Sequence, residues 1–303
     1  MTVLRAIHAR PTPPSAAVLA ALPSELARIR GTGGPDASVV IPVNAQADVG
    51  HLMALLTDLA RYRGGNRLEC IVVLNNYEPD EEPEARTSIE RTGATVVAVP
   101  SVRRSGEAVS FTARIPGLRA AATDVAINFD SDVRVPYPTS LIDWYVTTLT
   151  DRPDRVRAAY GPVLFHSVPR GFVADVAVAI HHASRWIKRT ILRIPTLRGS
   201  AYAARRQAML DAYDEGLLAD DMNVGPVLAR GGHEVKHDGD PRLAVRTSGR
   251  MYTFDWPTLA RYLRYRLRYN LRVIPVRADA ATKTGRDTDP VRRYVDDRPV
   301  LTR

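Results

Sequence analysis

Four apolar segments rich in β-branched residues alternate with helix-like segments between residues 37 and 130, and this order limits the folds open to the chain. Such uninterrupted apolar runs are typical of strands buried on both faces of a sheet. They read ASVVIPV (37–43), LECIVVLNN (68–76), ATVVAVP (94–100) and DVAINFD (124–130). The intervening segments (49–65, 84–93 and 106–123) have helical character, the last with Pro116 inside it. Alternation of this kind predicts an α/β fold with a mostly parallel sheet flanked by helices.

The flanking parts of the chain follow less regular patterns. Residues 1–36 predict a short helix that ends at Gly31, followed by a glycine-rich linker. Beyond residue 136 we expect a helix over 139–151, a strand over VRAAYGPVLFH (156–166) and a long helix over 173–193. A polar tail begins near residue 278.

Composition narrows the class of protein. The chain has 303 residues, with 42 basic against 33 acidic side chains and a formal charge of +9, which favours an anionic partner. Cys70 is the single cysteine, so neither an intrachain disulfide nor a cysteine metal site can form. We see neither a secretory leader nor an apolar run long enough to span a membrane, and we expect a cytoplasmic protein.

Two carboxylates follow the last of the four apolar segments, in AINFDSDVRVP. Asp130 and Asp132 should therefore lie at the carboxyl edge of the sheet, where α/β proteins bind ligands. Carboxylates this close repel each other unless a cation lies between them. Their oxygens suit Mn²⁺ or Mg²⁺ bridging a diphosphate. The alternative is a solvated turn.

Five motifs then occur in an order that resembles an inverting family 2 glycosyltransferase with the GT-A fold. They are SVVIPV, IVVLNN, ARIPGLRAAATDVAINFDSD, GSAYAARR and LLADDMNVGPVLARGGHEV, and the similarity covers about residues 37–250. The resemblance implies a Rossmann-like nucleotide-sugar-binding half (37–135) and an acceptor-binding, catalytic half (136–250). An N-terminal extension (1–36) and a C-terminal helix with a tail (251–303) would flank them.

The resemblance also implies roles for the acidic residues. Asp132 would bind the metal directly, and Asp130 would lie near the ribose and the water shell of the metal. Asp221 would be the general base that deprotonates the acceptor hydroxyl, with Asp220 supporting it. A carboxylate base implies a single displacement with inversion at the anomeric carbon.

Other positions match the parts of the family that hold the donor. Pro42 and Asn44 lie where the first loop meets the nucleotide base, and Arg114 would face phosphate or sugar. Gly199 and Ser200 would shape the sugar and acceptor pocket. The implied donor is a UDP- or GDP-linked sugar and the implied acceptor is an unidentified hydroxyl compound.

The sequence departs from the family pattern in three places. Asn75 and Asn76 stand where aspartates usually follow the second strand, which puts uracil specificity in question. Ile115 replaces the asparagine of the A-R-N-x-G helix, and the E-D pair is D-D. The Q-x-x-R-W signature of processive synthases is missing, so we expect transfer of a single sugar.

Three further sequence features each allow a functional and a purely structural interpretation. His237 is a candidate third metal ligand, or an ordinary strand histidine. Arg250 in RTSGR could close over a diphosphate, or lie in a plain turn. The arginine-rich segment 258–273 would touch an anionic membrane peripherally, or pack its leucines on the core. No nucleic-acid module is found, and homo-oligomer formation is left open.

Two other classes compete with the transferase. Haloacid-dehalogenase-like phosphatases also place D-x-D after a buried strand and would use Asp130 as the nucleophile. They usually carry a threonine where this chain has Arg134, and here three strands precede the pair. A non-catalytic nucleotide-sugar-binding protein is the third class, and the presence of both Asp132 and Asp221 argues against it.

Overall fold

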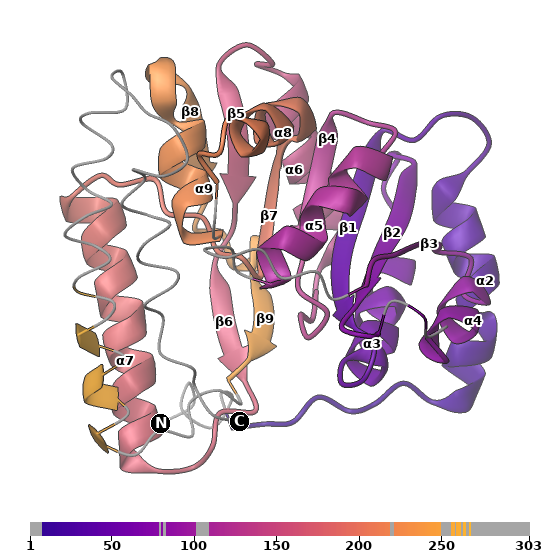
Figure 1. The fold of residues 1–303 in the computed structure, drawn as a ribbon, viewed down its shortest axis with the longest axis horizontal. Helices are drawn as coiled ribbons and strands as arrows, with labels where there is room; N and C mark the ends of the chain where they lie inside the picture. The colour runs from indigo at the N-terminus through magenta and orange to yellow at the C-terminus, as the bar shows by residue number, and fades with distance from the viewer. Residues whose placement is uncertain are drawn as a thin grey trace.

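A seven-stranded sheet with the order β3-β2-β1-β4-β7-β5-β8 forms the centre of the computed structural model (Figure 1). β7 runs antiparallel to both β4 and β5, and the other neighbouring strands are parallel. The structure describes residues 8–78, 80, 83–100, 109–218, 221–249 and part of 256–267. The strands are β1 (Ala37–Asn44), β2 (Leu68–Asn75), β3 (Thr95–Ala98), β4 (Val125–Phe129), β5 (Val156–Tyr160), β7 (Ala201–Arg205) and β8 (Glu234–His237).

Helices cover both faces of this sheet, and each face has its own apolar core. On one face lie α2 (Ala16–Arg30), α3 (Val49–Ala60), α4 (Ala85–Glu90) and α6 (Pro138–Thr150). On the face towards the viewer in Figure 1 lie α5 (Val109–Ala120), α8 (Arg206–Asp214) and α9 (Asp221–Leu228). β1 supplies both cores, because Val39 and Ile41 point to the first and Val40 to the second.

A smaller unit extends from the edge of the sheet that carries β5 and β8. It contains a two-stranded parallel sheet of β6 (Val163–His166) and β9 (Val245–Ser248), the helix α7 (Phe172–Trp186) and the π-helical turn η1 (Ile187–Ile191). Phe165, Val168 and residues of α7 form its apolar core, which Leu259 and Leu263 join. In Figure 1, α7 stands apart from the central sheet, beside β6.

The predicted α/β fold and its mostly parallel sheet are confirmed. β1 to β4 fall on the four predicted apolar segments, and α2 ends at Gly31 as expected. The single strand expected over 156–166 was wrong, because the segment forms β5 and β6 in two different sheets. Gly161 separates them and lies so close to the carbonyl oxygen of Leu243 that a Cβ there would collide with it.

The predictions for membrane contact fall largely outside the described residues. Within 258–273 the structure describes 259–261, 263, 264 and 267; Leu259 is buried, Leu263 packs on the α7 core and Leu267 is exposed. Among the described residues, no helix has both the length and the apolar character needed to cross a bilayer.

Candidate active site

Polar side chains end three neighbouring strands at one edge of the sheet. Asp130 follows the last residue of β4, and Asn44 and Asn75 end β1 and β2, where they are paired in register. β1 lies between β2 and β4, and all three run parallel. The predicted carboxyl edge therefore exists, and it carries the D-x-D pair.

Arg114 of α5 contacts three separate segments at this edge. Its side chain is fully buried, and its Nη2 donates to the Gly199 carbonyl oxygen at 2.7 Å and to the Asp130 carboxylate. Its Nε lies 3.2 Å from Oδ1 of Asp221, at the start of α9. A buried guanidinium is costly unless it is paired, so Arg114 draws three segments that are distant in sequence to one point.

The charges and rings around Arg114 favour its cationic form. Burial alone would lower the pKa of Arg114, but the carboxylates of Asp221 and Asp130 hold it above its ordinary value. The ring centroid of Tyr202 lies 5.9 Å from the guanidinium carbon. Burial, and next the charge of Asp221, raise the pKa of Tyr202, so its phenol stays neutral. The site thus holds one buried cation between two carboxylates.

Gly199 sets how closely the third segment approaches Asp221. A Cβ placed on Gly199 would lie 2.5 Å from Oδ2 of Asp221, so any larger residue there would displace the carboxylate. Asp221 is also the first residue of α9, where the helix dipole stabilises a negative charge. Ser200 is buried beside it, and its carbonyl oxygen accepts the Asp130 backbone N–H at 3.1 Å.

Asp132 is held from the smaller unit. Oγ1 of Thr247 donates to its Oδ1 at 3.1 Å, and Nε2 of His166 lies 3.3 Å from its carbonyl oxygen. Because a carbonyl can only accept, the proton of the His166 ring is on Nε2, and Nδ1 accepts from the Ser167 hydroxyl at 2.9 Å. Burial lowers the pKa of His166, consistent with this neutral form.

The asparagines form a connected polar cluster at the ends of β1 and β2. Nδ2 of Asn76 donates to Oδ1 of Asn44 at 3.0 Å, and the Gln46 backbone N–H donates to the same oxygen at 3.0 Å. Asn76 adopts φ 65, a left-handed conformation that asparagine tolerates. Pro42 is buried inside β1, two residues before its end.

The structure does not bring His237 to this site. It ends β8, which is three strands away from β4 in the sheet order. Its ring centroid lies 4.7 Å from that of Tyr160, and its Nε2 lies 2.8 Å from Nη1 of Arg189. Within the described parts of the chain, no three His, Cys, Asp or Glu side chains gather as a metal site. Asp220 and Arg250 lie outside the described residues.

Sequence reasoning missed four residues that shape this edge: Thr247, His166, Tyr202 and Asp58. Thr247 lies within RTSGR, the segment in which Arg250 was selected as a candidate diphosphate-binding residue. Tyr202 lies within the GSAYAARR motif, where only Gly199 and Ser200 were selected, and His166 belongs to no motif. Each acts through a contact with a segment distant in sequence.

The segment that follows Asp132 is fixed by the buried carboxylate of Asp58 on α3. Oδ2 of Asp58 accepts from Nε of Arg134 at 2.7 Å and from the Val135 backbone N–H at 2.9 Å. Oδ1 accepts from Arg61 at 2.8 Å and from Arg134 at 2.9 Å. Asp58 therefore anchors the turn that carries the D-x-D pair to the helix beneath it.

Replacing Asp58 with alanine should destabilise the protein by about 3–5 kcal/mol, because it leaves a partly buried arginine and a buried backbone donor without their acceptor. Urea denaturation measures the effect. Asp214→Ala is the matched control, since its ion pair with Arg119 is more than half exposed and contributes less than about 1 kcal/mol. Equal losses in the two variants would contradict an anchoring role for Asp58.

Comparisons with known proteins agree with this architecture. No protein-family model matches the sequence, and no curated protein matches it significantly. Among solved structures, a mannosyltransferase from Pyrobaculum calidifontis, bound to GDP-Man and Mn²⁺, matches 93% of this chain and 78% of its own at 17% identity, with a TM-score of 0.52.

Two weaker matches concern other glycosyltransferase structures. TarS from S. aureus (residues 1–349) matches 86% of this chain and 70% of its own at 15% identity, with a TM-score of 0.49. Glucosyl-3-phosphoglycerate synthase from Mycobacterium tuberculosis matches 86% of this chain and 84% of its own at 19% identity, with a TM-score of 0.40. The sheet order and the first of these similarities show that the chain has the GT-A fold.

Proposed function

We propose that this protein is a metal-dependent inverting glycosyltransferase that moves a single sugar from a nucleotide diphosphate sugar to an acceptor hydroxyl. The observation that carries the proposal is the buried Arg114, which gathers Asp130, Asp221 and the Gly199 backbone at the carboxyl edge of the sheet. Displacement at an anomeric carbon needs a stabilised leaving group on one side and a base on the other. The two carboxylates come from separate segments, as that division of work requires.

The chemistry of the D-x-D pair fits a divalent cation. Mg²⁺ and Mn²⁺ sites at diphosphates commonly use one or two protein carboxylates and take their remaining ligands from phosphate and water. Asp132 and Asp130 offer such a pair, and Thr247 orients one of the carboxylates. The bound cation would supply Lewis-acid stabilisation of the departing diphosphate.

Two buried donors next to the carboxylates support an anionic ligand. Nη1 of Arg114 and the hydroxyl of Tyr202 are both buried without a hydrogen-bond partner among the described residues. Buried polar groups are seldom left unpaired in a protein, so each calls for an acceptor that the described chain does not provide. Phosphate or sugar oxygens of the donor would serve.

Asp221 is the base in this proposal. The charge of Arg114 favours the ionised carboxylate, which is the form that accepts the proton of the acceptor hydroxyl. Only 14% of the Asp221 side chain is exposed, so the carboxylate is largely shielded from water. The phosphatase alternative gains no support, because the carboxylate of Asp130 is tied to Arg114 and Arg134 is tied to Asp58.

A nucleotide-binding measurement tests the proposal without an acceptor. UDP or GDP with Mn²⁺, at about 100 times the dissociation constant, should stabilise the protein by ~2.7 kcal/mol and raise its melting temperature by roughly 5 °C. Asp132→Ala should abolish the shift, because it removes the direct metal ligand. Asp154→Ala, which changes an exposed carboxylate just before β5, should retain it. No shift with either nucleotide would reject the donor assignment.

A further inference from the structure

A cavity lies between η1 and the edge strand β8. Its volume is about 330 Å³, enough for a small metabolite. The side chains that matter for its chemistry are those of Tyr160, Arg189, Arg193, His233, Lys236 and His237. None of these residues has a role in the proposed transfer reaction.

Positive charge dominates this cavity. Among its described lining residues, Arg189, Arg193 and Lys236 stand against a single carboxylate, Glu234. That carboxylate is already paired with both Arg155 and Lys236. The cavity therefore carries a net positive charge that a bound anion would balance.

Arginines in and near this cavity also act on three neighbouring titratable groups. Burial, and next the charge of Arg189, lower the pKa of His237 to about 4. His182 is lowered to about 4 by burial and by Arg198 and Arg185. Burial raises the pKa of Tyr160, while the charges of Arg185, Arg189 and Arg198 act in the opposite direction. Arg185 acts on all three groups, and Arg189 of the cavity lining acts on His237 and Tyr160.

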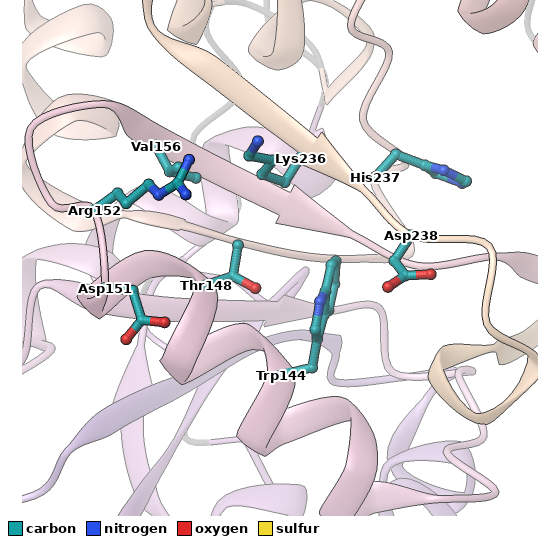
Figure 2. A pocket seen from close by; sticks show the side chains of 8 residues that line it. All are labelled: Trp144, Thr148, Asp151, Arg152, Val156, Lys236, His237 and Asp238. Carbon is teal, nitrogen blue, oxygen red and sulfur yellow. The ribbon is translucent and has the colours of Figure 1, made fainter.

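The cavity on the opposite side of β8 provides a contrast. Figure 2 shows its lining, with Trp144 of α6 standing beside Asp238 and the ring of His237 directed away from them. This cavity has about 290 Å³, and its cations, Arg152 and Lys236, are matched by Asp151 and Asp238. An anion is therefore favoured on the η1 side of β8 and not on the α6 side.

The backbone beside the charged cavity is unusual. η1 is a π-helical turn, a rare form that is often found at functional sites. Arg193 follows it with φ 51, a left-handed conformation that is unfavourable for arginine. Nη1 of Arg189 reaches Nε2 of His237 across the cavity at 2.8 Å. These local features direct two arginines of one segment to the same space.

The cavity also lies at the correct edge of the sheet. Tyr160 ends β5 and His237 ends β8, and both strands point in the same direction as β4 because β7 is antiparallel to both of its neighbours. Strands are ~4.8 Å apart, so these ends lie about 10–15 Å from Asp130. The chain from Ile194 to Gly199 connects the cavity to the proposed base.

We propose that this cavity binds a phosphate or carboxylate group of the acceptor, so that the acceptor is an acidic molecule whose hydroxyl lies at Asp221. The proposal rests on the proposed transfer reaction. Arginine suits the task, because its planar fork donates two parallel hydrogen bonds to either anion.

Matched probes test the proposal on the full chain. Calorimetry measures the binding of three probes: glucose, glucose 6-phosphate and glucuronate. Each probe is titrated first into the protein alone and then into the protein saturated with UDP and Mn²⁺. The two acidic probes should bind at least 10-fold more tightly than glucose, with or without nucleotide. Arg189→Gln combined with Arg193→Gln should weaken the acidic probes at least 10-fold and leave nucleotide binding unchanged.

Arg86→Gln is the control variant, because Arg86 is a partly exposed arginine on α4, beside β3 at the opposite end of the sheet. It should bind all probes as the unaltered protein does. Equal affinity for glucose and its acidic analogues would overturn the proposal. So would competition between acidic probes and UDP–Mn²⁺, since that places the anion in the donor site. Loss of nucleotide binding alone would instead reject the proposed function, while the probe titrations would still report on the cavity.

Discussion

Replacing Arg114 by glutamine is expected to lower the free energy of unfolding by about 3 kcal/mol, because Asp130 and Asp221 lose the buried cation that pairs with both. The Gly199 carbonyl would also lose a charged donor. Urea denaturation should show an earlier midpoint. Affinity for UDP or GDP with Mn²⁺ should also fall, since the two carboxylates would no longer be held at the sheet edge.

Arg119→Gln is the matched control for this prediction. It removes the same charge from the same helix, but its ion pair with Asp214 is more than half exposed. Its loss should stay below about 1 kcal/mol, with nucleotide binding unchanged. If Arg114→Gln were as stable as Arg119→Gln, the claim that Arg114 organises the site would be wrong.

The first half of the fold could be predicted from sequence because its signals are local. β1 to β4 are each a short apolar run, so composition alone marks them. β1, β2 and β4 are buried, whereas β3 at the edge of the sheet is partly exposed. The position of Asp130 follows directly, because the residue after a strand lies at the edge of the sheet. No distant contact was needed for that inference.

The second half could not be predicted as well, because its elements depend on distant contacts. VRAAYGPVLFH reads as one strand until Gly161 packs on Leu243, which lies far along the chain and forces the segment to change sheets. β7 reads as a glycine-led segment, and its antiparallel place between β4 and β5 has no local sign.

In the candidate site too, local motifs were predicted from sequence and distant contacts were not. The resemblance selected Asp130, Asp221 and Gly199, and the structure places them within one network. It also assigned Arg114 to phosphate or sugar, which stays a prediction, and the structure adds its contacts with the two carboxylates and a backbone carbonyl. The motif identified the residue, but only tertiary structure identified its partners.

These contacts also explain how the carboxylates coexist. Asp130 and Asp221 would repel each other, and the charge of Arg114 between them reduces that repulsion. Asp132 lies outside that pairing and bonds to Thr247 instead. Asp132 is therefore held by a different contact from the other two carboxylates.

Replacing Asp221 by asparagine should reduce kcat by roughly 10²–10⁴, the range expected when a general base is lost. Asparagine keeps the shape of the side chain and an oxygen near Arg114, so donor affinity and the melting temperature should change little. Release of free nucleotide from a UDP- or GDP-linked sugar, with water or an acceptor as the attacking group, measures the effect. Asp221→Glu should retain part of the activity, because it keeps a carboxylate on α9. Turnover in Asp221→Asn equal to that of the unaltered enzyme would exclude Asp221 as the base and move that role to another residue of the edge.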